Sequence, residues 1–186
     1  HEKKNRRKVE TLLDATSTNR MECSILISEG LSAKSSISEA REAATTAAFA
    51  LTGKFNNVYG WTAAQVLSMG KLTDLLLVIG LTPGKPAIRS QLHYGRIVIA
   101  TDADSDGNSI FANLVNLFYR FWPELFDPTL LPIVHRLLAP NVVASKGNNR
   151  VHFTTRTDFE QAGKKYSNWT IEYMKGLGSL SKQDWT

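Results

Sequence analysis

The sequence lacks the features that mark several large classes of protein. It has one cysteine, Cys23, among 186 residues, so no internal disulfide and no metal site built from several cysteines can form. Its longest apolar runs, such as residues 75–79, are far shorter than the ~20 residues of a membrane-spanning helix. The N-terminus is polar and basic rather than a secretory signal, and no glycine-rich nucleotide loop of an ATPase module occurs. These absences predict a protein of the reducing cytoplasm that neither enters a membrane nor binds ATP itself.

What the sequence does contain is an ordinary globular composition with an excess of positive charge. Hydrophobic residues make up 42% and charged residues 21%, which fits one domain with small appendages. The net charge of +5 favours a nucleic acid as partner. We interpret residues 1–20 as a basic linker or arm, either solvated or in contact with a DNA backbone, and residues 21–186 as one domain. Because the chain opens at His1 inside this arm, without an initiator Met, we expect it to be part of a longer protein.

The hydrophobic pattern alternates between short apolar runs and longer amphipathic stretches. The apolar runs predict buried strands at residues 23–28, 96–101, 131–139, 150–154 and 169–174. The other pattern predicts helices at residues 33–51, 62–69, 72–79, 108–121 and 158–162. Strands that alternate with helices in this way predict an α/β fold with a mainly parallel, Rossmann-like central sheet flanked by helices.

Carboxylates follow two of the predicted strands. Glu29 comes after the first strand, and Asp102, Asp104 and Asp106 follow the strand at residues 96–101. Sites in open α/β sheets lie beyond the carboxyl ends of the strands, and alternate residues of an extended tip can share a face. Acidic groups this close repel one another unless a cation neutralises them. Hard oxygen ligands suit Mg²⁺, so the sequence predicts a magnesium site here.

Two other interpretations of the aspartate cluster start from the same residues. In an EF-hand calcium loop that begins at Asp102, Gly107 takes the expected sixth position, but the twelfth position is Asn113 instead of Glu. The segment before Asp102 is also β-rich where an EF-hand needs a helix. Alternatively, the aspartates cap the following helix, which would explain one of the three.

Beyond the acids, motifs along nearly the whole chain resemble the TOPRIM domain of type IIA DNA topoisomerases. Five segments are similar to that family's EGDSA, GKxLNV, MTDADVDG, FFYRxxPEL and YKGLG motifs, in the same order: residues 29–33, 53–58, 99–107, 118–125 and 173–178. The additional Met174 within the last motif resembles the large subunit of T-even-type phage enzymes. Leu31 and Ser109 depart from the family pattern, which has Asp and His at these places, but neither departure removes an expected metal ligand.

The resemblance implies roles for particular residues in a TOPRIM fold. Mg²⁺, as one or two ions and with Mn²⁺ as a substitute, would be held by Glu29, Asp102, Asp104 and Asp106. Glu29, Asp102, Asp104 and Lys175 would be catalytic, with Glu29 as a ligand or as a general acid. DNA would be contacted by Arg41, Lys54, Asn57, Lys175, Gly176 and Gly178.

The resemblance further implies that the chain is one part of an ATP-hydrolysing topoisomerase that cleaves and religates double-stranded DNA. The attacking tyrosine would come from a winged-helix domain or subunit, and ATP would bind a separate ATPase module. The chain alone would then be inactive in strand passage. Two alternatives are a stand-alone TOPRIM nuclease that cuts DNA with water, and a DNA-binding scaffold whose acids hold no metal.

Overall fold

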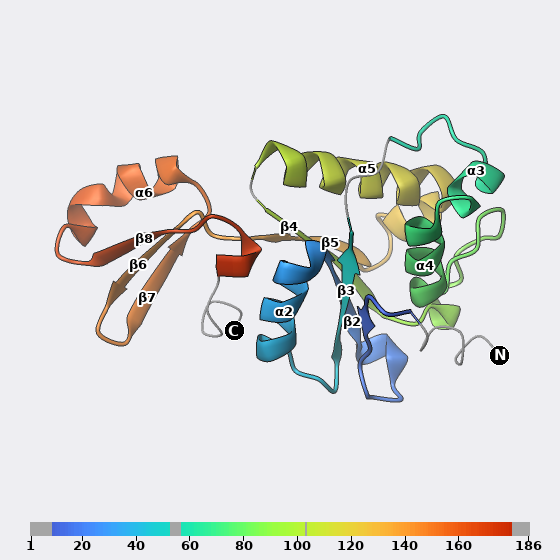
Figure 1. Ribbon diagram of the computed structural model, residues 1–186, viewed down its shortest axis with the longest axis horizontal. Coiled ribbons are helices and arrows are strands. Elements are labelled where there is room, and N and C mark those ends of the chain that lie inside the picture. The colour runs from blue at the N-terminus through green and yellow to red at the C-terminus, as the bar shows by residue number, and fades with distance from the viewer. Residues whose placement is uncertain (1–8, 53–56, 103, 180–186) are drawn as a thin grey trace.

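A mainly parallel sheet forms the centre of the molecule. The computed structural model describes residues 9–52, 57–102 and 104–179 (Figure 1). Within these residues, one sheet has the strand order β1-β3-β2-β4-β5. Its strands are β1 (Leu12–Leu13), β2 (Ser24–Glu29), β3 (Thr46–Leu51), β4 (Arg96–Thr101) and β5 (Val134–Leu138). Only the short edge strand β1 is antiparallel to its neighbour, and the other pairs are parallel. The predicted α/β class with a mainly parallel central sheet is confirmed.

The two faces of this sheet are packed differently. One face carries large side chains, such as Ile27, Phe49 and Ile99, in a core shared with α4 (Gly70–Ile79) and α5 (Ser105–Phe121). The other face carries Ala100 and contacts Ala33 of α2 (Gly30–Ala40). Strand side chains alternate between faces, so a strand buried on both sides can have bulky residues on one and small residues on the other. In Figure 1, α5 runs above strands β4 and β5, and α2 lies below them.

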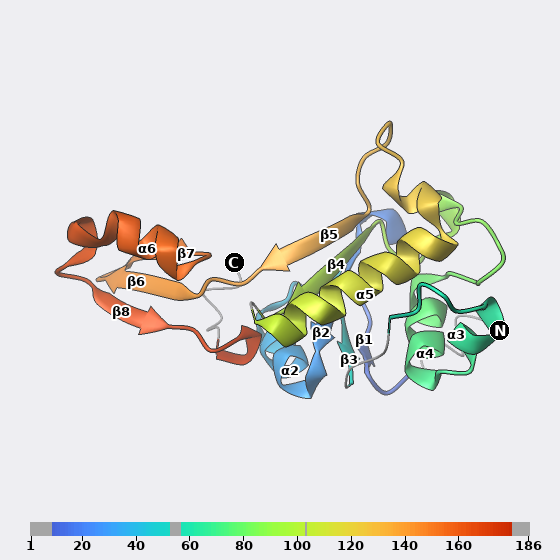
Figure 2. The same cartoon turned by 90° about the horizontal axis from the view of Figure 1, so that it is seen from above.

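A second, smaller sheet stands apart from the first, as both views show (Figures 1 and 2). It is antiparallel, with the order β7-β6-β8, and consists of β6 (Val142–Lys146), β7 (Asn149–Phe153) and β8 (Thr170–Tyr173). Helix α6 (Arg156–Ala162) accompanies it. Edge-to-face contacts link its aromatic rings, which are Phe153, Phe159, Tyr166, Trp169 and Tyr173.

The remaining elements are short connectors. Helix α3 (Ala63–Leu67) begins with a capping box between Thr62 and Gln65. Single 3₁₀ turns occur at η1 (Arg20–Glu22), η2 (Arg89–Gln91), η3 (Pro123–Phe126), η4 (Gly163–Tyr166) and η5 (Leu177–Ser179). In the part of the chain that the structure describes, no helix is both long and apolar enough to cross a membrane.

One secondary-structure prediction is wrong, and one strand was missed. The helix predicted over residues 33–51 ends at Ala40, and residues 46–51 form β3 at the centre of the sheet. Alanine favours helices in isolation, but Ala48 and Ala50 are nearly fully buried within β3, where tertiary packing overrides that preference. Strand β6 was not predicted, and neither was the second sheet to which it belongs.

Part of the stretch assigned to the basic arm has defined structure. Within residues 9–20, β1 pairs with β3, and Val9 and Ala15 are buried in the large core. The five clustered basic residues of the arm lie outside the described residues: Lys3, Lys4, Arg6, Arg7 and Lys8.

Candidate functional site

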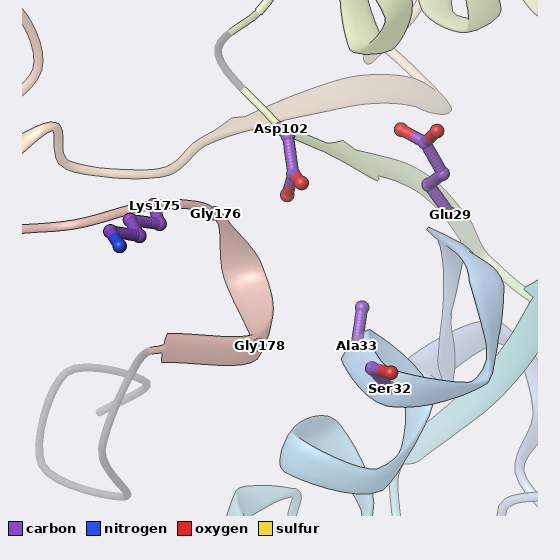
Figure 3. Close-up of a pocket in the computed structure, with 7 residues that line it drawn as sticks. All are labelled: Glu29, Ser32, Ala33, Asp102, Lys175, Gly176 and Gly178. Carbon is purple, nitrogen blue, oxygen red and sulfur yellow. The ribbon is translucent and has the colours of Figure 1, made fainter.

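Two acidic residues lie at the carboxyl end of the parallel sheet. Strand β2 ends at Glu29, and the neighbouring strand β4 is followed directly by Asp102. The two strands are parallel, with Ser28 opposite Ala100, so their following residues emerge at the same edge. Glu29 and Asp102 both line a cavity of about 220 Å³ (Figure 3). Its other lining residues are Ser32, Ala33, Lys175, Gly176 and Gly178.

The C-terminal glycine motif is held against Asp102. The backbone N–H of Leu177 donates a 2.8 Å hydrogen bond to Asp102 Oδ1. Gly176 has φ +145°, and a Cβ at this position would lie 2.5 Å from Asp102 Oδ2. Only glycine combines this backbone conformation with so close an approach. The Leu177 side chain is fully buried in the small cluster with Ala33, so it anchors the motif across the strand ends.

Leu177 is a site residue that the sequence reasoning missed. The prediction treated the motif at residues 173–178 as a surface that contacts DNA. The structure adds a contact within the chain, because the backbone of the motif orients a predicted metal ligand. The motif itself was the available signal, but its contact with Asp102 joins residues 75 positions apart. No local pattern reveals such a contact.

Asp104 begins helix α5. Its Oδ1 accepts a 2.7 Å hydrogen bond from the backbone N–H of Gly107, as an N-cap does. A Cβ on Gly107 would collide with the backbone carbonyl of Asp102, so the first turn of α5 lies directly on the site loop. Asp102 and Asp104 share a second cavity of about 120 Å³, which Ala139, Asn141, Met174, Lys175 and Gly176 also line. The capping interpretation therefore accounts for Asp104 alone, and the strand before Asp102 removes the EF-hand interpretation.

Helix N-termini offset the repulsion between these acids. Glu29 is the N-cap residue of α2, and Asp104 is the N-cap residue of α5. The partial positive charge at a helix N-terminus stabilises a nearby carboxylate by about 0.3–1 kcal/mol. Asp106 lies exposed in the first turn of α5 and lines neither cavity.

The arrangement of the carboxylates suits Mg²⁺ better than it suits an ion that side chains must surround completely. Among the residues that the structure describes, no three His, Cys, Asp or Glu side chains form a group arranged to hold an ion. Glu29 and Asp102 share one cavity, however, and Asp102 and Asp104 share the other. Mg²⁺ needs only one or two carboxylates, because it retains water molecules and takes further oxygens from a phosphate. Asp102, common to both pairs, is the residue around which such a site would form.

The other predicted contact residues are divided between the site and the rest of the molecule. Lys175, Gly176 and Gly178 line the larger cavity. Arg41 instead lies at the amino end of strand β3, away from the site, where its Nη1 donates to the carbonyls of Asp14 at 3.3 Å and of Thr46 at 2.5 Å.

The predicted contacts after β3 are only partly described. Asn57 is exposed, lines neither cavity and accepts a 2.9 Å hydrogen bond from the backbone of Tyr59. Lys54 lies outside the described residues.

Known proteins resemble the chain over nearly its whole length. DNA topoisomerase 2 of Drosophila melanogaster is 30% identical over 187 residues, which cover 95% of this chain and 13% of the relative. DNA topoisomerase 2 of Plasmodium falciparum (isolate K1 / Thailand) is 31% identical over 186 residues, with the same shares covered. DNA topoisomerase 2-alpha of Gallus gallus is 29% identical over 188 residues, which cover 95% of this chain and 12% of the relative. No protein-family model matches the chain.

A solved structure shares the fold. It is the crystal structure of the Plasmodium falciparum topoisomerase II DNA-binding, cleavage and re-ligation domain, with a TM-score of 0.82 and 28% sequence identity. The match covers 95% of this chain and 25% of that chain. The chain thus spans only about an eighth of the length of these curated relatives and a quarter of the solved structure's chain.

Proposed function

We propose that this chain, which is homologous to type II DNA topoisomerases over 95% of its length, is the cation-binding part of an enzyme that cleaves and religates double-stranded DNA. One observation carries the proposal. Glu29 and Asp102, from adjacent strand ends, line one cavity together with Lys175 and Gly176 of the C-terminal motif. Carboxylates, a lysine and a glycine backbone in one open cavity are the groups needed to bind a cation and a phosphate together.

The acidic residues would hold Mg²⁺, with Mn²⁺ as a substitute. Asp102 would be the central ligand, supported by Glu29 and Asp104, and Asp106 would contribute to a second ion. A bound cation would polarise the scissile phosphate and stabilise negative charge on the oxygen that leaves. Leu177 holds Asp102 in place by its backbone N–H. Glu29 would serve either as a ligand or as the general acid that protonates the leaving oxygen.

The basic and glycine residues would hold the DNA. Lys175 is exposed and lines both cavities, so its ammonium group would neutralise a phosphate beside the carboxylates. Gly176 and Gly178 would let a phosphate approach the backbone closely. Asn57 and Lys54 would extend the contact along the duplex. Arg41 would act only at the amino end of the strands, away from the site.

The complete reaction would need other domains or subunits. The attacking tyrosine would come from a winged-helix region, and ATP hydrolysis from a separate ATPase module. The chain alone would bind a cation and, weakly, DNA, but would not pass one duplex through another.

Cation binding by the isolated chain tests the proposal. Mn²⁺ binding would be measured by isothermal titration calorimetry for wild type, Asp102→Asn and Asp74→Asn. Asp74 is an exposed aspartate of α4 and serves as the matched control. We expect Asp102→Asn to lose most of the binding and Asp74→Asn to retain it. Equal binding by all three proteins would contradict the proposal and favour a scaffold without a metal.

A DNA assay separates the topoisomerase role from a nuclease role. The chain would be reconstituted with a winged-helix partner and incubated with plasmid DNA and Mn²⁺. We expect cleavage that leaves a covalent protein–DNA adduct and that Glu29→Gln largely abolishes. Repeated cleavage by the chain alone, without an adduct, would instead establish a nuclease that cuts with water.

A further inference from the structure

One buried hydroxyl beside the site has no hydrogen-bond partner among the residues that the structure describes. Thr101, the last residue of β4, is 3% exposed, and its Oγ1 is buried without a partner among the described residues. Ser28 occupies a similar place near the end of β2 and is 1% exposed, but its Oγ donates to the carbonyl of Phe49 at 3.4 Å. Native proteins satisfy most buried polar groups, because an unsatisfied one retains the cost of its lost hydration. The contrast with Ser28 sets the Thr101 hydroxyl apart.

The hydroxyl is enclosed next to the predicted ligands. Ile97 and Ile99 of β4 belong to the core that α5 shares, while Ala100 belongs to the cluster on the α2 face. Because strand residues alternate, Thr101 faces α5. The first turn of α5 lies on the backbone of Asp102, where Gly107 leaves no room for a Cβ. Thr101 Oγ1 is therefore buried between the end of β4 and the beginning of α5, directly before Asp102.

We propose that Thr101 is a positioning residue for the cation site, and that its hydroxyl gains a hydrogen-bond partner when the nearby carboxylates of Asp102 and Asp104 bind a divalent cation. The inference rests on the proposed function. A hydroxyl both donates and accepts; Asp102 follows Thr101 directly in the chain, and Asp104 is the N-cap residue of α5. The free chain then carries an unsatisfied group that the bound chain satisfies. Because only the bound chain satisfies the hydroxyl, this difference favours the bound state and raises the affinity for the cation.

Removal of the hydroxyl should have opposite effects on the two states. Thr101→Val keeps the shape and the β-branch but removes the polar atom, which relieves the free chain and deprives the bound chain of a hydrogen bond. We expect the dissociation constant for Mn²⁺ to rise about 10-fold, as when a group that orients a ligand is lost. The melting temperature without cation should stay equal or rise by about 2–4 °C, the shift that a modest stabilisation causes in a chain of this size.

Calorimetric titration of the full chain with Mn²⁺, together with thermal melting without cation, tests this expectation. Thr101→Ser retains the hydroxyl and should bind Mn²⁺ like wild type. Ser28→Ala is the control for the melting experiment, and it should lower the melting temperature because it removes a hydroxyl that has a partner.

Two results would overturn the inference. Thr101→Val that binds Mn²⁺ as wild type does would show that the hydroxyl is not used in the bound state. Thr101→Val that melts below wild type, or fails to fold, would show that the hydroxyl already has a partner in the free chain. If wild type itself shows no binding that Asp102→Asn removes, the proposed function fails instead, and the two failures remain distinguishable.

Discussion

The two sheets of this molecule place their polar residues differently. The parallel sheet is covered by helices on both faces, so its polar chemistry lies at the ends of strands, where Glu29 and Asp102 emerge. The antiparallel sheet packs its aromatic residues on the side of α6 and leaves polar side chains such as His152 and Glu172 exposed. It contributes to the site through the segment that leaves β8, which returns to bond Asp102. A site at a strand end can thus depend on a distant segment as much as on the sheet that carries its ligands.

The largest effect should follow from the loss of the anchor of that returning segment. Leu177→Ala empties a fully buried position in the cluster with Ala33 and Ala100. We expect a loss of about 2–5 kcal/mol in the free energy of unfolding, measured by urea denaturation, and weaker Mn²⁺ binding. Phe159→Ala in the small sheet is the comparison. It should loosen that sheet, as seen by hydrogen exchange, but leave Mn²⁺ binding near the wild-type value. Equal losses of Mn²⁺ binding in both variants would contradict the expectation that the returning segment supports the site and the small sheet does not.

The next effect concerns the glycine that touches Asp102. Gly176→Ala forces a side chain into a left-handed backbone conformation and against Asp102 Oδ2, so we expect a cost of about 1–3 kcal/mol in stability. The displaced carboxylate should also weaken Mn²⁺ binding about 10-fold or more. Gly147→Ala, in the turn of the small sheet, has φ +59° and nothing within 4 Å of a new Cβ. It should cost stability without a change in Mn²⁺ affinity, and a loss of affinity in this control would contradict the assignment.

Arg41 allows a comparison between the two ends of the strands in the parallel sheet. Its guanidinium bonds the carbonyls of Asp14 and Thr46, far from the carboxylates. Arg41→Ala should therefore cost about 1.5–3 kcal/mol in stability, as charged hydrogen bonds do, and should change DNA affinity less than Lys175→Ala. Fluorescence anisotropy with a labelled duplex would measure both variants. A larger loss of DNA affinity in Arg41→Ala than in Lys175→Ala would mean that the amino end of the strands also contacts DNA.

Two ion pairs, one taken from each region, give a further comparison. Asp14 Oδ1 accepts from Arg20 Nη2 at 2.8 Å and from the Tyr94 hydroxyl at 2.6 Å, in a half-buried setting. In the small sheet, Arg150 and Glu172 approach to 3.5 Å, with the glutamate half-exposed. We expect Asp14→Asn to cost about 1–3 kcal/mol at pH 7, and Glu172→Gln less than about 1 kcal/mol. Thermal melts would measure the loss of stability in both variants. A larger loss in Glu172→Gln than in Asp14→Asn would contradict this expectation.

The pH dependence of the Asp14 pair follows from the pKa of Arg20. Burial opposes the positive charge, but the hydrogen bond and the charge of Asp14 outweigh burial and raise the pKa of Arg20 above its ordinary value. A group with a raised pKa contributes its full stability below the unfolded pKa and loses it only as pH rises through the folded value. The contribution of Arg20 is therefore fully present at neutral pH, so Asp14→Asn should be compared with wild type there.

Much of the site could be predicted because its geometry follows from strand ends. The run at residues 96–101 is apolar, stops at Asp102 and forms β4 with these bounds. Two parallel neighbouring strands that both end in acids place those acids at one end of the sheet, so the position of Glu29 beside Asp102 follows once β2 pairs with β4. Both residues line the same cavity.

The rest depended on contacts that local patterns do not record. Residues 46–51 look helical because alanine dominates them, and only the burial of β3 between its neighbours makes them a strand. Strand β6 is short, and its pairing with β8 joins segments that β7 and α6 separate along the chain. The hydrogen bond from Leu177 to Asp102 exists only after the second sheet has turned the chain back. The role of Lys54, which lies outside the described residues, stays a prediction.

The most direct test is whether the carboxylates of Glu29 and Asp102 act on the same cation. Mn²⁺ affinity would be measured for Glu29→Gln, for Asp102→Asn and for the double variant, in a thermodynamic cycle. If both residues hold one ion, the loss in the double variant should be clearly smaller than the sum of the two single losses, because the first substitution already disrupts the site. Two losses that add, or a Glu29→Gln variant with wild-type affinity, would contradict a shared cation site at these strand ends.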